Sequence, residues 1–263
     1  MTWEVSSNCS FSTSRFDPDF FHLPHEENFG FIDIPAGPFL MGSDKEVDKD
    51  AKENDYPQLE VNLSAFSISK YPVTVAQYRS FAEDTQRELD DFWQKRNQFD
   101  NHPVGAVSWY DAVAYCKWLT DKMKKWGLDW TIQLPTEAQW EKAARGSDGR
   151  IYPWGDEPDP NRMNFEDTGI GSSSLVGCFR GGESPYGLYD MAGNVYEWCQ
   201  DEYEENSKDD SINPKRHKHG DYRVIRGGSW LHPAKHCRSA SRNRNGSDLR
   251  SFRLGFRLLR SLP

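Results

Sequence analysis

The stretch that follows Gly146 constrains the fold most, because about 50 residues there show no sustained helical or strand pattern. Gly, Asp, Asn, Pro and Ser dominate this stretch, and only short apolar clusters interrupt them. These residue types favour turns and loops. A loop of that length inside a compact domain usually carries function or a bound ion. The sequence therefore predicts sparse regular structure after Gly146.

Regular structure is predicted mainly before Gly146. Alternating apolar residues predict a short strand beginning at Phe29 and ending in turns, a charged loop over 44–55, and a second strand over 61–68. A short helix follows at 75–84. Two longer helices carry end signals: one over 108–125, with Ser108 and Asp111 as a capping box, and one from Thr136, with Gln139 three residues on, to Gly146.

The composition predicts a soluble protein with a sizeable core. Apolar residues make up 36% of the chain and aromatic residues 14%, with ten tryptophans. No segment approaches the ~18 apolar residues that a bilayer span needs, and the first residues lack a signal-peptide pattern. We therefore expect a cytoplasmic, unexported protein, which a partner could still display at a surface. Residues 1–28 are predicted to be a polar leader, to which no function is assigned.

The five cysteines are scattered and odd in number, which disfavours a disulfide framework and a paired metal-binding motif. Reduced thiols are the expectation. Cys237, with His232 and His236, is a candidate nucleophile or soft-metal cluster, but no further spaced pair completes a tetrahedral set. Walker-type, Rossmann, HExxH and GxSxG motifs are absent from the sequence.

The net charge of −9 hides an asymmetry along the chain. From Pro214 onward there are 13 Lys or Arg residues against 2 Asp or Glu residues, whereas the first 213 residues carry 19 against 39. With Trp230 and Phe252, the arginines of this tail could form a phosphate-binding and base-stacking face. Internal pairing of the guanidinium groups with the acidic body is favoured over that interpretation.

The segment DMAGNVYEW, residues 190–198, is a candidate calcium site. Calcium takes carboxylate and carbonyl oxygens, which Asp190, the carbonyls of Gly193 and Val195, and Glu197 could provide. A helix N-terminus capped by Asp190 or Asn194 explains the same residues equally well.

Eight ordered motifs between Phe29 and Leu259 carry a family resemblance. They are FLMGS, KYPVTVAQYRSF, PVGAVSWYDAVAYCKWL, LPTEAQWEKAARG, YPWGDE, YGLYDMAGNVYEW, RVIRGGSW and LGFRL. The chain resembles the formylglycine-generating enzyme, or sulfatase-modifying-factor, family, a variant of the C-type lectin fold. The resemblance implies one α+β domain over 29–263 with little regular secondary structure, two main helices and small antiparallel sheets. It also implies structural Ca²⁺ at the DMAGNVYEW segment.

The resemblance implies two different functions. Oxidase members of the family have two cysteines after the GGS motif that bind copper, and here Cys237 matches the second while His232 replaces the first. An oxidase acting on a protein cysteine would use Cys237 as its sole metal thiolate and Ser229 as an auxiliary polar group. Copper(I) prefers paired thiolates, which disfavours this alternative.

The tail GGSWLHPAKHCRSASRNRNGSDLRSFRLGFR is more similar to the variable proteins of diversity-generating retroelements. In that family a C-terminal region, here about 226–257, is randomised at adenine-containing codons and binds a protein or other macromolecular ligand without catalysis. Fixed residues hold the backbone and variable side chains face solvent. If Leu231 and Phe252 were core residues, this interpretation would fail. The residues at the expected variable positions are Leu231, His232, His236, Ser241, Arg244, Leu249, Ser251, Phe252 and Arg253.

Overall fold

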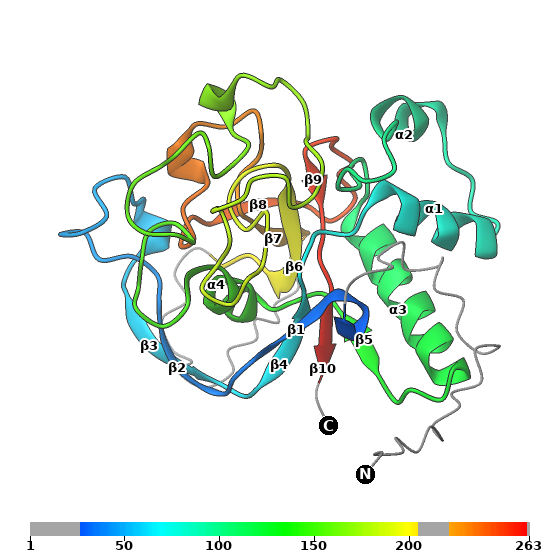
Figure 1. Ribbon diagram of the computed structural model, residues 1–263, viewed down its shortest axis with the longest axis horizontal. Helices are drawn as coiled ribbons and strands as arrows, with labels where there is room; N and C mark the ends of the chain where they lie inside the picture. The colour runs from blue at the N-terminus through cyan, green and yellow to red at the C-terminus, as the bar shows by residue number, and fades with distance from the viewer. Residues whose placement is uncertain (1–26, 205–220, 262–263) are drawn as a thin grey trace, which may run out of the picture.

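The computed structural model describes residues 27–204 and 221–261. Residues 1–26, most of the predicted leader, and much of the polar insert after Asp201 lie outside the described residues. The structure contains helices and short strands joined by long loops (Figure 1). It is the expected α+β architecture with small sheets.

The α-helices begin and end where local sequence signals place them. They are α1 (Val75–Asp84), α2 (Asp91–Arg96), α3 (Trp109–Lys125) and α4 (Glu137–Arg145). In α3 the Ser108 hydroxyl accepts a hydrogen bond from the Asp111 N–H at 3.2 Å, and the Asp111 carboxylate accepts one from the Ser108 N–H at 2.9 Å. Each capping residue thus satisfies a donor that the first turn would leave unpaired. The predictions for α1, α3 and α4 are confirmed, whereas α2 was not predicted.

The strands form two four-stranded sheets and one two-stranded sheet within the described residues. Their orders are β1-β4-β10-β5, β2-β3 and β8-β7-β6-β9. The strands are β1 (Phe31–Ile34), β2 (Gly37–Met41), β3 (Leu59–Leu63), β4 (Phe66–Ser69), β5 (Thr131–Gln133), β6 (Tyr196–Glu202), β7 (Tyr222–Arg226), β8 (Asn243–Gly246), β9 (Leu254–Gly255) and β10 (Leu259–Ser261).

Two strand predictions need correction. The single strand expected over 61–68 is two strands, β3 and β4, because the chain leaves one sheet after Leu63 and enters another at Phe66. The predicted strand at Phe29 is likewise divided into β1 and β2, which pair in different sheets. Alternating hydrophobicity indicates a strand but does not reveal which sheet it joins.

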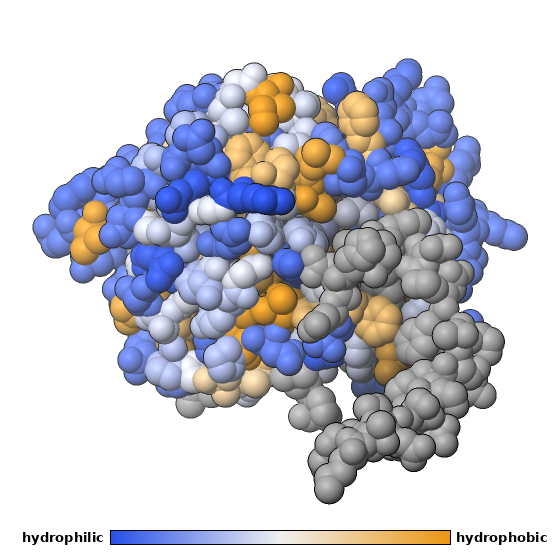
Figure 2. Space-filling model, in the orientation of Figure 1, coloured by the Kyte–Doolittle hydropathy of each residue, from blue (hydrophilic) through white to orange (hydrophobic). Residues whose placement is uncertain are grey.

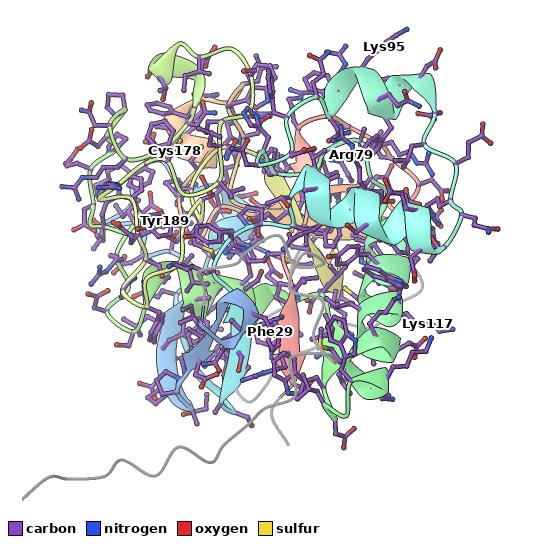
Figure 3. All side chains as sticks on the ribbon, turned by 45° about the vertical axis from the view of Figure 1, so that its right-hand side comes forward. Phe29, Arg79, Lys95, Lys117, Cys178 and Tyr189 are labelled. Carbon is purple, nitrogen blue, oxygen red and sulfur yellow. The ribbon has the colours of Figure 1, made fainter. Side chains whose placement is uncertain are left out.

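Buried side chains fill three neighbouring clusters. The first packs aromatic side chains of α1 and α3 together, and Tyr78, Phe81, Tyr115 and Trp118 contact one another there. The second surrounds Trp140 of α4. The third is formed by side chains of the long loop that follows Gly146, packed together with Cys237. Helices α1, α2 and α3 lie on one side of the molecule (Figure 1), and Lys117 on α3 lies far from Cys178 and Tyr189 of the loop after Gly146 (Figure 3).

The surface seen in Figure 2 is mostly hydrophilic, with hydrophobic residues in small groups between polar ones. Among the helices of the described residues, none combines the length and the apolar character that crossing a bilayer requires.

Candidate functional site

The C-terminal segment 226–257 is held in the fold by four buried arginines. Each pairs with carboxylates from the body of the chain. Arg226 pairs with Glu141, Arg238 with Asp48 and with Asp55 at 2.6 Å, Arg242 with Glu137 at 2.5 Å, and Arg257 with Glu197 at 2.6 Å. All four guanidinium groups are at least nine-tenths buried. They belong to the interior, as the charge asymmetry favoured, and are unavailable to a phosphate backbone.

Backbone hydrogen bonds fix the segment between these arginines. Several of its carbonyls accept from N–H groups elsewhere in the chain, among them Ser251 from Ala106 at 2.9 Å, Arg253 from Tyr196 at 2.8 Å, and His232 from Glu166 at 3.1 Å. Gly105 approaches the same backbone so closely that a Cβ there would lie 2.6 Å from the Phe252 carbonyl oxygen. The path of the segment therefore depends on its backbone and on buried arginines.

Most of the expected variable side chains reach the surface. Leu231 is 45% exposed and Leu249 42% exposed, although both are apolar. Arg244 is exposed as well, and five of the others are partly exposed: His232, His236, Ser251, Phe252 and Arg253. Ser241 is an exception, because it is only 4% exposed and its carbonyl accepts a hydrogen bond from Arg226. The prediction of a solvent-facing side chain at Ser241 is therefore wrong.

The exposed positions form neighbouring groups. The rings of His232 and His236 lie 5.4 Å apart, and His232 also contacts Tyr196 at 5.0 Å. The Phe252 ring lies 5.8 Å from that of Trp230. Arg244, on β8, lies over the rings of Tyr203 and Tyr222 at 4.7 and 5.4 Å.

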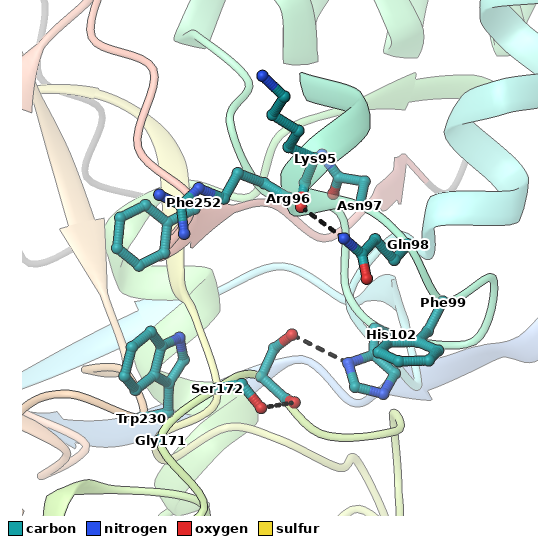
Figure 4. Close-up of a pocket in the computed structure, with 11 residues that line it drawn as sticks. Lys95, Arg96, Asn97, Gln98, Phe99, His102, Gly171, Ser172, Trp230 and Phe252 are labelled. Carbon is teal, nitrogen blue, oxygen red and sulfur yellow. Dashed lines mark hydrogen bonds between the residues drawn. The ribbon is translucent and has the colours of Figure 1, made fainter. Parts of the chain in front are cut away.

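An open pocket of about 280 Å³ lies beside Phe252 (Figure 4). Trp230 and Phe252 form one side, and the opposite side comes from the end of α2 and the loop after it, including Phe99 and His102. Gly171–Ser173 of the long loop complete the lining. The α2 residues of this lining were not predicted from the sequence. The available signal was Asp90, whose side chain accepts from the Trp93 N–H at 2.8 Å and caps this short helix.

The Cys237 thiol is enclosed. It is fully buried beside Tyr152, Met163 and Phe165, and a Cβ on Gly228 would lie 2.5 Å from its sulfur. Burial raises the pKa of Cys237 to about 12, so the thiol stays protonated at neutral pH. Burial therefore disfavours the thiolate form that a nucleophile needs.

His232 stands where the oxidase members of the family have the first of their two cysteines. Its Nδ1 atom lies 2.6 Å from the Ser229 hydroxyl oxygen. Burial, with the nearby positive charge of Arg253, lowers the pKa of His232 to about 4, so the ring is neutral at pH 7. In the part of the chain that the structure describes, no three His, Cys, Asp or Glu side chains converge in a way that could hold a metal ion.

The residues of the expected calcium site are close in the chain but do not offer a free carboxylate set. Glu197 lies on β6 rather than in a loop, and its fully buried carboxylate accepts from Arg257 at 2.6 and 2.7 Å and from the Trp140 indole N–H at 2.7 Å. Asp190 accepts from the Gly177 N–H at 2.7 Å and from Asn194. Burial raises the pKa of Asp190 to about 6. Gly193 and Val195 are buried.

Within this set the carboxylate of Glu197 is already paired with Arg257, which disfavours it as a calcium ligand. Structural Ca²⁺ at this segment stays a prediction. The alternative, a helix capped by Asp190 or Asn194, is wrong. Both residues lie in a loop that leads into β6, and both have a positive φ.

This chain is similar in sequence to several known proteins. The family model described as a sulfatase-modifying factor enzyme 1-like domain matches residues 18–262. The serine/threonine-protein kinase pkn1 of Chlamydia caviae is 33% identical over 247 residues, covering 85% of this chain. The chain spans only 37% of the length of that relative. The inactive C-alpha-formylglycine-generating enzyme 2 of Mus musculus is 30% identical, over 89% of this chain and 87% of the relative.

Two solved structures share the fold over most of their length. PvdO from Pseudomonas aeruginosa superposes with a TM-score of 0.76 at 25% identity, covering 88% of this chain and 94% of the other. Variable protein 1 of Treponema denticola superposes with a TM-score of 0.71 at 25% identity, covering 87% and 94%.

The pairing of Glu197 with Arg257 leads to a prediction about calcium. Glu197→Gln leaves a buried guanidinium uncompensated, and we expect it to lower the free energy of unfolding by about 3–5 kcal/mol. Because the partner of Glu197 is an arginine, the same loss should be measured in thermal unfolding with excess calcium and with EDTA. Glu46→Gln, at an exposed carboxylate, is the matched control. A loss that vanished in EDTA would instead identify Glu197 as a metal ligand.

Proposed function

Because the chain belongs to the family of sulfatase-modifying factor enzyme 1-like domains, we propose that it uses this fold as a ligand-binding scaffold without catalysis. Its C-terminal segment, residues 226–257, is diversified by a retroelement and binds a protein or other macromolecule. The observation that carries the proposal is the separation of roles within that segment. Buried arginines and backbone hydrogen bonds hold the chain path, whereas eight of the nine expected variable side chains are exposed or partly exposed.

The surface formed by these side chains suits recognition. It mixes aliphatic, aromatic, imidazole and guanidinium groups, and its apolar members Leu231 and Leu249 are exposed. Binding surfaces of adaptable proteins combine rigid backbone with such mixed side chains. The likeness to a protein described as a variable protein, at a TM-score of 0.71, supports the same assignment.

Tolerance to substitution is the first test. Exchanging Leu231, His232, Ser251 and Phe252 together should change stability little, because exposed substitutions usually contribute within about 0.5 kcal/mol each. Chemical denaturation measures the change. Arg238→Gln is the contrasting control within the same segment, with an expected loss of about 3–5 kcal/mol, because it leaves the carboxylates of Asp48 and Asp55 buried without their partner. Insolubility of the fourfold variant would place these side chains in the core and reject the binding surface.

Diversification itself is tested on DNA. Sequencing the few kilobases that flank the gene should find a reverse transcriptase and a near-copy of the segment 226–257. In that copy, adenines should stand at the codons of the eight exposed or partly exposed positions. A flanking region without either feature contradicts diversification, whatever the protein binds.

The competing function is a copper-dependent oxidase that acts on a protein cysteine, which the family membership favours. It would depend on Cys237, with Ser229 nearby. Because Cys237 is enclosed and protonated and has His232 where a second thiolate would be needed, we expect no turnover. The assay is oxygen consumption with copper(I) and a cysteine-containing sulfatase peptide, comparing the wild type with Cys237→Ser. Oxygen consumption by the wild type that disappears in Cys237→Ser would contradict the proposal of a scaffold without catalysis.

A further inference from the structure

The pocket beside Phe252 has walls from three separate parts of the chain. The end of α2 and the following loop contribute Lys95–Phe99 and His102, the long loop contributes Gly171–Ser173, and the C-terminal segment contributes Trp230 and Phe252 (Figure 4). Its volume of about 280 Å³ is of the size that admits one large side chain or a small ligand. It is therefore a defined recess in the surface proposed to bind.

The charged groups of the pocket are all cationic. Lys95 and Arg96 are exposed at its rim, and its lining includes neither Asp nor Glu. Within the described residues, neither cation has a carboxylate partner, and the Arg96 guanidinium lies 4.5 Å from the centre of the Phe252 ring. Burial lowers the pKa of His102, so its ring adds no charge at neutral pH. The rim thus favours an anionic group.

The inner surface of the pocket is aromatic. Trp230 and Phe252 pack at 5.8 Å on one side, and Phe99, which is 61% exposed, packs against His102 at 4.9 Å on the other. The His102 Nδ1 atom and the Ser173 hydroxyl, 3.0 Å apart, place polar atoms between these walls. Ring faces and edges in this arrangement suit a planar apolar group.

Only one residue of the lining occupies a variable position. Phe252 comes from the diversified set, whereas the cations, Phe99, His102 and Trp230 do not. The backbone of Phe252 packs closely against Gly105. Substitution of Phe252 therefore changes one side chain of the lining and leaves the backbone around the pocket in position. Diversification would therefore reshape one wall while the cationic rim stays constant.

We propose that this pocket binds an aromatic side chain flanked by carboxylates, supplied by an acidic peptide segment of the protein ligand. The aromatic side chain enters between Trp230 and Phe99, and flanking carboxylates contact Arg96 and Lys95. This inference rests on the proposed function, since it names the ligand chemistry of the same surface.

The test uses three capped tripeptides and one small acid, titrated by NMR onto the full chain. Acetyl-Asp-Tyr-Asp-amide carries both features, Asn-Tyr-Asn lacks the charge, and Asp-Ala-Asp lacks the ring. 3-Phenylpropionate carries ring and carboxylate without a peptide. We expect only Asp-Tyr-Asp to bind measurably, more weakly as salt rises.

Two variants assign the binding to the pocket. Arg96→Gln should lower the affinity for the Asp-Tyr-Asp peptide about fivefold, because it removes one exposed ion pair. Phe252→Ser should lower this affinity about tenfold, because it removes an aromatic contact with the tyrosine ring. Lys124→Gln, an exposed cation on α3, and Tyr110→Ser, an exposed ring on α3, are the matched controls and should not change the affinity.

Each other result overturns the assignment. Equal affinity for Asp-Tyr-Asp and Asn-Tyr-Asn would show that the ligand does not need its carboxylates. Unchanged affinity in both pocket variants would show that the peptide binds outside this pocket. Phenylpropionate binding as tightly as the peptide would make a small acid the ligand. None of these results bears on the DNA and substitution tests, so failure of the pocket assignment is distinguishable from failure of the scaffold proposal.

Discussion

The buried pairs between C-terminal arginines and carboxylates of the body are the constraint on which the rest of the structure depends. Arg226, Arg238, Arg242 and Arg257 meet partners between Asp48 and Glu197, so each pair closes a long stretch of chain. A guanidinium removed from water is tolerated only where carboxylates and carbonyls satisfy its donors. These pairs specify where a segment with little secondary structure must lie, a task that sheets or helices perform in more regular folds.

Local interactions were predictable from the sequence, and long-range ones were not. The capping boxes of α3 and α4 depend on residues three positions apart, so Ser108 and Thr136 marked the helix starts correctly. Strand β6 was missed, because its neighbours β7 and β9 arrive much later in the chain. The exposed face of residues 226–257 was expected from a family resemblance, and eight of the nine expected side chains are exposed or partly exposed, whereas Ser241 is buried.

Glu197 illustrates the same limit at a single residue. Beside Asp190 and a glycine, its carboxylate indicated a metal ligand. In the structure its ion-pair partner is Arg257, sixty positions later, which the local sequence cannot reveal. The pocket beside Phe252 was missed for a similar reason, since α2 and the 171–173 loop meet the C-terminal segment only in the folded chain.

The burial of Ser241 has a consequence for any repertoire made on this scaffold. If the codon of Ser241 were randomised as well, it would place large side chains in a site packed among buried residues, between Ala240 and Arg242, where only small ones fit. Many members of such a repertoire would fail to fold before meeting any ligand. The number of functional sequences is then set jointly by codon chemistry and by a steric filter inside the protein, and folding acts as the first round of selection.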